Sequence, residues 1–135
     1  MPLFDWKDNY SMGIAEIDTQ HQKLFDIINH LYDLMRQSQA VTLIKPILQE
    51  LTDYAAYHFS TEEKYFVKFQ YPEMESHIRE HLAYKQKIND FVLEADHPDG
   101  TIPFTLMNFL SDWWVNHIIG VDKHYIQCFK DHGLK

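Results

Sequence analysis

The chain has 135 residues, of which 45% are hydrophobic and 15% aromatic, and its formal net charge is -8. A chain of this length can bury a core without disulfides, so we expect one domain spanning residues 1–135. The negative charge argues against nucleic acid or an anionic membrane surface as a partner. The single cysteine, Cys128, excludes an intrachain disulfide and a four-cysteine metal site. No apolar segment approaches the roughly 20 residues of a membrane span and no secretory signal is visible, so we expect a cytoplasmic protein.

The first part of the chain predicts an extended arm followed by a helix. Residues 1–17 are interrupted by polar, proline and glycine residues, so we expect an N-terminal arm whose aromatic side chains pack on the side of the protein. Asp18 or Thr19 is a candidate N-cap for the first helix. A second helix should begin near Thr42 after a turn at residues 38–41.

The second part of the chain predicts two more helices. Pro72 disfavours helix at Tyr71 and can open the third helix. His97–Gly100 is a strong turn signal. The fourth helix should continue past Gly120 towards Cys128. Because short turns make neighbouring helices antiparallel, we predict an all-α, up-down-up-down four-helix bundle over residues 18–132.

Each predicted helix has one narrow stripe of residues at alternating spacings of three and four, which is the pattern of a buried helix face. The stripes contain His21, Leu24, Ile28, Leu31 and Met35; Leu48, Leu51, Ala55, His58, Glu62, Tyr65 and Phe69; Met74, His77, His81, Tyr84, Ile88, Phe91 and Ala95; and Leu106, Leu110, Trp113 and His117.

Histidines within these stripes are the strongest chemical signal. The second and third helices each carry a pair of candidate ligands spaced i, i+4, so both members of a pair project from one helix face. Counted from the turns at about 1.5 Å per residue, independent spacings bring the candidates of all four helices to one level of the bundle. These candidates are His21, His58, Glu62, His77, His81 and His117.

Asp122 joins this level only if the fourth helix is deformed. It follows His117 by five residues, which on a regular helix turns it about 140° away. A local bulge with i+5 hydrogen bonding would return it to the inner face, and Gly120 makes such a deformation easier. We therefore predict a bulge that brings Asp122 into the site.

The candidate ligands favour a redox-active metal pair. Imidazole and carboxylate donors suit iron, zinc, copper or nickel better than magnesium or calcium. Five histidines and two bridging carboxylates, together with a solvent-derived oxo or hydroxo bridge, fill all but one coordination position of two octahedral ions. Zinc prefers four ligands and has no redox chemistry, so the donor set favours two non-haem iron ions. The open position suits a small diatomic ligand, and a shell of neutral imidazoles favours its reversible binding over oxygenation.

Residues near the candidate ligands suggest a pocket that excludes water and contacts that orient the histidines. Either Glu63 or Glu80 could accept a hydrogen bond from a ligand. The apolar residues predicted to line an O2 pocket are Leu24, Phe25, Phe59, Trp113 and Ile118. Ile119 also lies within a turn of a ligand.

A single histidine on an apolar helix face is more often a buried hydrogen-bonding residue than a metal ligand. Five histidines on one level with two carboxylates are better explained as a site. His30 lies about 180° from His21 around the first helix and is expected at the surface. We expect the same of His97, His124 and His132, whereas Cys128 should pack as a small hydrophobe.

A set of residues spread over nearly the whole chain carries a family resemblance. It comprises Gly13; Ile17, Asp18, Gln20 and His21; His58, Phe59, Glu62 and Glu63; Tyr71 and Pro72; His77 and His81; and His117, Ile118, Asp122 and Lys123. This pattern resembles the hemerythrin family, specifically its single-domain bacterial branch. The resemblance implies that one iron is bound by His77, His81 and His117 and the other by His21 and His58, that Glu62 and Asp122 bridge them, and that O2 binds the iron held by two histidines.

The leading hypothesis is reversible O2 binding by a carrier, storage or delivery protein that is not an enzyme. The alternatives are an O2, redox or NO sensor, a di-iron enzyme that detoxifies NO or peroxide or repairs iron centres, and a structural zinc site. NO and small anions are further candidate ligands, and a protein that receives O2 is a further candidate partner.

Overall fold

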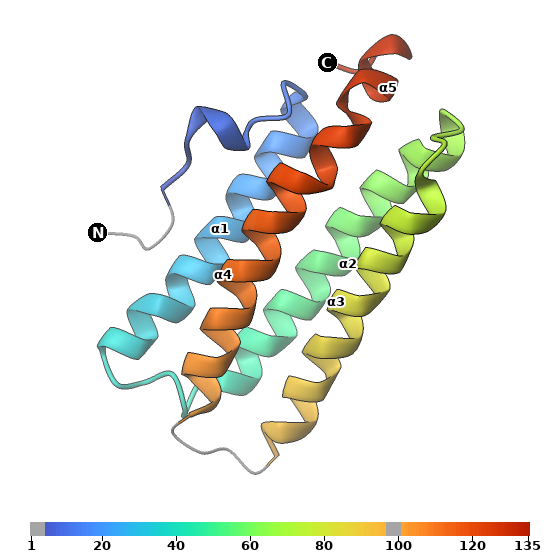
Figure 1. Ribbon diagram of the computed structural model, residues 1–135. Coiled ribbons are helices and arrows are strands. Elements are labelled where there is room, and N and C mark those ends of the chain that lie inside the picture. Colours follow the sequence, from blue (N-terminus) through green and yellow to red (C-terminus); the bar gives the residue numbers. More distant parts are fainter. Residues whose placement is uncertain (1–4, 97–100) are drawn as a thin grey trace.

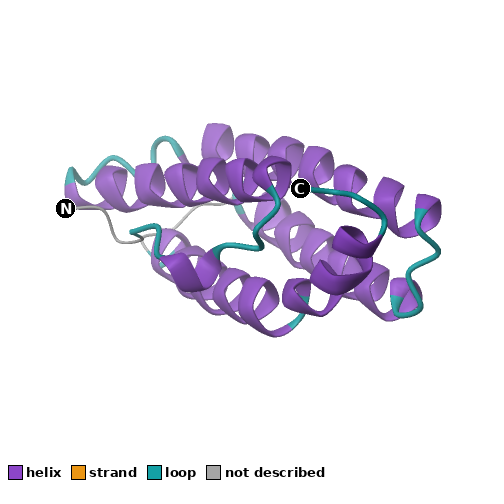
Figure 2. Ribbon diagram, turned by 90° about the horizontal axis from the view of Figure 1, so that it is seen from above, coloured by secondary structure: helices purple, strands orange, loops and turns teal. Residues whose placement is uncertain are grey.

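The structure, a computed structural model, describes residues 5–96 and 101–135, and every regular element within these ranges is a helix (Figure 2). The long helices are α1 (Ala15–Arg36), α2 (Ile44–Lys68), α3 (Met74–Glu94) and α4 (Ile102–Gly120). The short ones are the 3₁₀ helices η1 (Asp8–Tyr10) and η2 (Asp122–Tyr125) and the helix α5 (Ile126–Asp131). The predicted all-α class is confirmed. The turn predicted at His97–Gly100 lies outside the described residues.

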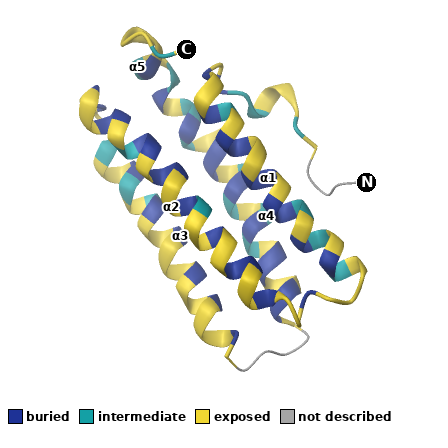
Figure 3. Cartoon of the chain, turned by 180° about the vertical axis from the view of Figure 1, so that it is seen from behind, coloured by how far each residue is buried: buried dark blue, intermediate teal, exposed yellow. Residues whose placement is uncertain are grey.

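The long helices form an antiparallel bundle. α1 and α3 each contact both α2 and α4. Successive helices run in opposite directions, as Figure 1 shows, so the predicted up-down-up-down arrangement is confirmed. Each helix presents a buried stripe to the interior and an exposed face to the outside (Figure 3). Within the described part of the chain, no helix has the length and apolar character needed to cross a membrane.

The first helix begins at Ala15, earlier than predicted. Gly13 has a φ of 68°, a left-handed conformation that glycine adopts without strain, and it turns the chain into α1. The prediction that Asp18 or Thr19 caps the helix is wrong, because both residues lie within α1. There the Asp18 carboxylate accepts hydrogen bonds from the Ser11 hydroxyl (2.5 Å) and the Met12 N–H (2.7 Å). A carboxylate at this end of a helix is also favoured by the helix dipole, so Asp18 stabilises the helix start and holds the preceding segment.

The turn between α2 and α3 forms where Pro72 predicted it. Gln70 has a φ of 54°, and the Tyr71 N–H donates to the Phe66 carbonyl (2.9 Å), a pattern that closes the end of α2. The third helix then begins at Met74. The turn therefore holds the candidate ligands of α2 and α3 on neighbouring, antiparallel helices.

The predicted i+5 bulge and the continuous fourth helix are wrong. α4 ends at Gly120, and the chain passes through Val121 into η2. The Val121 N–H donates to the His117 carbonyl (2.9 Å) with ordinary α spacing, whereas the His124 N–H donates to the Val121 carbonyl (3.1 Å) with the tighter 3₁₀ spacing. This change in winding turns Asp122 to the interior, where its side chain is fully buried.

Candidate metal centre

Seven buried side chains from α1, α2, α3, α4 and η2 form two groups, and within each group the possible ligand atoms lie within 4.8 Å of one another. We call them the three-histidine group (Glu62, His77, His81 and His117) and the two-histidine group (His21, His58, Glu62 and Asp122). Each of these side chains is at most 2% exposed. The structure thus brings together all seven residues that the sequence predicted as metal ligands.

Asp122 contacts histidines of both groups. Its Oδ1 lies 2.9 Å from His77 Nε2 and 3.0 Å from His117 Nε2, both in the three-histidine group. Its Oδ2 lies 3.1 Å from His21 Nε2 in the two-histidine group. The carboxylate therefore lies between the two groups.

Glu62 also contacts a histidine of each group. Its Oε1 lies 3.3 Å from His58 Nε2 and 3.2 Å from His81 Nε2. The Nε2 atoms of His21 and His58 are 3.1 Å apart. All five histidines thus direct Nε2 towards the two carboxylates, the arrangement that a shared metal site requires.

Burial controls the charges of the site. It lowers the pKa of His58 to about 4 and that of His81 to about 3, so both imidazoles are neutral near neutral pH. Burial and the neighbouring Asp122 raise the pKa of Glu62. Burial also acts to raise the pKa of Asp122, but its contacts with His117, His21 and His77 hold that pKa well below the usual range.

The residues fit bound metal ions. The oxygens of Asp122 and the Nε2 atoms of His77, His81 and His117 are buried, lie 2.9–3.2 Å from an opposing ligand atom of the cluster, and have no well-aligned hydrogen-bond partner among the described residues. Buried polar atoms in proteins nearly always have such a partner, and buried carboxylates need a counter-charge. Metal cations supply both, because they accept the Nε2 lone pairs and neutralise the carboxylates.

Two of the histidines are oriented by a contact on their outer nitrogen. His58 Nδ1 lies 2.6 Å from Gln20 Oε1, and His81 Nδ1 lies 2.7 Å from Glu63 Oε2. Both oxygens are acceptors, so each ring donates its Nδ1–H outwards and turns the Nε2 lone pair towards the centre. Glu63 was one of the two acceptors considered from the sequence. The role of Gln20 was not predicted.

Most of the predicted pocket residues lie beside the site. Phe59 stacks on His81 with ring centroids 3.8 Å apart, and Trp113 stacks on His117 at 4.2 Å. Leu24 and Ile118 are fully buried on ligand-bearing helices. Ile119, in contrast, is 38% exposed and lies outside the pocket.

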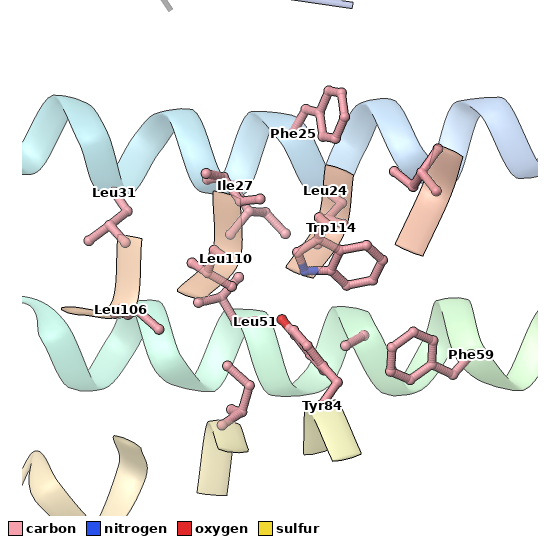
Figure 4. Close-up of a cluster of buried hydrophobic side chains, with 14 of the residues drawn as sticks. Leu24, Phe25, Ile27, Leu31, Leu51, Phe59, Tyr84, Leu106, Leu110 and Trp114 are labelled. Atoms are coloured by element: carbon pink, nitrogen blue, oxygen red, sulfur yellow. The ribbon is translucent and has the colours of Figure 1, made fainter. Parts of the chain in front are cut away.

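Phe25 lies apart from the other predicted pocket residues. Its ring packs against Trp6 (5.7 Å between centroids) and Tyr10 (5.0 Å) of the N-terminal segment. Figure 4 shows Phe25 directed away from the interior, on the opposite side of α1 from Leu24. Helical spacing placed Phe25 near a ligand, but the segment that covers it decides its surroundings.

Sequence reasoning missed two aromatic residues beside the site. Trp114 is fully buried, with its ring centroid 6.1 Å from those of both His58 and His117. Its position four residues after Leu110 could have identified it, but the predicted stripe passed through Trp113. Tyr125 stacks on His77 at 5.7 Å and is also fully buried, and no helical stripe predicted it because it follows the end of α4.

The fold and site define a four-helix bundle whose interior can hold metal ions between histidines and carboxylates. The chain belongs to the hemerythrin family, because residues 12–129 match the domain described as "Hemerythrin HHE cation binding domain". It is similar to bacteriohemerythrins from Clostridium acetobutylicum (34% identity, 92% of this chain and 99% of the relative) and Stenotrophomonas maltophilia (30% identity, 98% and 85%). The structure is also similar to that of a wild-type hemerythrin, with a TM-score of 0.82 and 28% identity over 93% of this chain and 97% of the other. The predicted family resemblance is confirmed.

Proposed function

We propose that the protein binds O2 reversibly at a non-haem di-iron centre and acts as an O2 carrier, store or delivery protein rather than an enzyme. The observation that carries the proposal is the pair of ligand groups that share Glu62 and direct every histidine Nε2 to the same small volume. The bacteriohemerythrin relatives support this choice of function.

The three-histidine and two-histidine groups would each hold one iron ion. Glu62 and Asp122 would bridge the ions, together with an oxo or hydroxo group from solvent, because each carboxylate contacts histidines of both groups. Two iron ions held by these residues would supply the redox chemistry that reversible O2 binding needs. The neutral imidazoles favour the ferrous state and therefore favour release over further oxidation.

The two-histidine group is the proposed O2 site, because it provides one histidine fewer and leaves one position open. Leu24 is fully buried one turn from His21, Ile118 is fully buried next to His117, and Trp114 packs close to His58. These buried apolar side chains would keep bulk water from a ligand bound there. NO or a small anion would compete with O2 for the same position.

Anaerobic iron loading tests this proposal directly. Metal analysis should find two iron ions per chain, and the visible absorption should appear in air, disappear on degassing and return over many cycles. His77→Ala should reduce iron retention, whereas the matched control His30→Ala should not, because His30 is exposed on α1.

Other outcomes would replace the proposed function. Irreversible oxidation with turnover of NO or peroxide would indicate a di-iron enzyme. A loaded protein that stays colourless in air would indicate a structural zinc site.

A further inference from the structure

The acceptors that orient His58 and His81 differ in charge. Gln20 is a neutral amide and only 4% exposed, whereas Glu63 is a carboxylate whose side chain is 31% exposed. The two contacts are of nearly equal length, at 2.6 Å and 2.7 Å. The two rings are therefore held in the same way by groups of different electrostatic character.

Among the described residues, His58 and His81 are the only ligand candidates whose outer nitrogen, Nδ1, has a hydrogen-bond acceptor. The Nδ1 atoms of His21, His77 and His117 are buried and have no hydrogen-bond partner there. Each ligand group thus contains one ring with an outer acceptor, His58 in the two-histidine group and His81 in the three-histidine group.

Gln20 is itself fixed in place. Its Nε2 donates to Thr61 Oγ1 (3.2 Å), and the Thr61 hydroxyl donates to the Tyr57 carbonyl (3.2 Å). The Tyr54 hydroxyl donates to the Gln20 backbone carbonyl (2.9 Å). These contacts direct the amide oxygen, and not the amide nitrogen, at His58. Gln20 is therefore built to present a neutral acceptor.

We propose that Gln20 and Glu63 are positioning residues whose difference in charge makes His81 a stronger metal donor than His58. A carboxylate that accepts the Nδ1–H of an imidazole increases the electron density at Nε2, and such outer contacts change metal affinity by about 10–100-fold. A neutral amide fixes the ring in the same orientation but increases this density less. The inference deepens the proposed function, because it makes the proposed O2 position the weaker and less electron-rich of the two metal positions.

Stepwise titration of the metal-free protein with Co²⁺ tests the inference without O2. The visible bands of Co²⁺ report the ligand environment, so two dissociation constants and two spectra are obtained. We expect Glu63→Gln to weaken the first, tighter step by about tenfold or more, because it keeps an acceptor but removes the charge. We expect Gln20→Glu to strengthen the second step by about tenfold, a gain that structural damage cannot produce.

Glu80→Gln is the matched control. It removes a carboxylate from α3, one residue before His81, whose charge acts on His77 without a hydrogen bond to that ring's Nδ1. It should therefore change either constant by less than Glu63→Gln does. Helix content measured by circular dichroism verifies that each variant is folded.

The inference is overturned if Glu63→Gln and Glu80→Gln have equal effects, or if Gln20→Glu does not strengthen the second step. Failure of this inference can be distinguished from failure of the proposed function, because the Co²⁺ titrations do not involve O2. A protein that shows the expected Co²⁺ titrations but does not release O2 would retain the inference and lose the carrier role.

Discussion

The two halves of the bundle interior are equally buried but chemically opposite. Near the turn between α1 and α2, the interior is filled by aliphatic side chains such as Leu31, Leu51 and Leu106, all fully buried (Figure 4). Towards the other end of the bundle, the interior contains five histidines and two carboxylates that are just as inaccessible, with aromatic rings such as Phe59 and Phe66 packed on the imidazoles. The same four helices therefore enclose a hydrocarbon core and a polar centre.

The two halves differ in what their burial does to the free energy of unfolding. Burial of apolar surface contributes roughly 25 cal/mol per Å² to stability, so the aliphatic half stabilises the bundle by itself. Buried carboxylates without hydrogen bonds cost free energy unless cations neutralise them. Bound metal cations would therefore stabilise the polar half.

The largest expected effect is that of metal removal. Each ion bound only by the folded state stabilises it by about 4 kcal/mol at a free concentration 1,000 times its Kd. We therefore expect the metal-free protein to unfold at a clearly lower urea concentration and temperature than the reloaded protein. Equal stability of the two forms would contradict the assignment of the polar half as a metal centre.

Leu51→Ala should lower the free energy of unfolding through the aliphatic half alone. A buried leucine replaced by alanine loses apolar burial and leaves a cavity, at a cost of about 2–5 kcal/mol. The loss should be the same with and without metal, as measured by urea unfolding. The control Leu82→Ala on the exposed face of α3, where Leu82 is 56% exposed, should cost less than about 0.5 kcal/mol.

Glu62→Gln, in contrast to Leu51→Ala, should change stability in a way that depends on pH and on bound metal. A carboxyl whose pKa is raised on folding, as that of Glu62 is by burial and Asp122, stabilises the metal-free fold only while protonated. This contribution is lost as the pH rises above the ordinary value of 4.5. We expect the metal-free variant to lose less stability than the parent between about pH 5 and pH 8, because an amide cannot ionise.

The same variant should bind metal poorly. Glu62 belongs to both ligand groups, so its loss should weaken Co²⁺ binding by more than the 10–100-fold expected for the loss of an outer contact. A variant that binds two ions with nearly unchanged affinity would show that Glu62 is not a shared ligand.

Trp113→Ala should have a smaller effect, confined to the polar half. The indole stacks on His117 and is only partly buried, so its removal opens the edge of the site to water. We expect the oxygenated protein to autoxidise about tenfold faster, equivalent to roughly 1.4 kcal/mol, while its unfolding changes little. Phe104→Ala, which removes an exposed aromatic ring from α4, is the control. An unchanged oxygenated lifetime in Trp113→Ala would remove this residue from the pocket.

Tyr65→Phe should cause the smallest loss of stability, and this loss should be independent of bound metal. The Tyr65 hydroxyl donates to Glu16 Oε1 (2.5 Å) and joins α2 to the first turn of α1. Its removal should cost about 1 kcal/mol, whether or not metal is bound. A much larger loss in the metal-loaded protein would show that this hydrogen bond supports the centre.

Local periodicity in the sequence determined the architecture and the level at which the candidate ligands meet. The spacing of His58 and Glu62, and of His77 and His81, assigns each pair to one helix face. The length of each helix from its turn sets the height of that face in the bundle. These properties depend only on the rise and twist of a helix, so they can be calculated without knowledge of the neighbours.

The tertiary structure alone decided the details that depend on how helices end and on what covers them. Asp122 reaches the centre through the end of α4 and the start of η2, because a 3₁₀ turn changes the winding that the helical period assumes. Phe25 faces the N-terminal segment, and the outer contacts of Gln20 and Glu63 depend on the rotation of α1, α2 and α3 against one another. Periodicity assigns a residue to a helix face, but tertiary packing decides which residues contact that face.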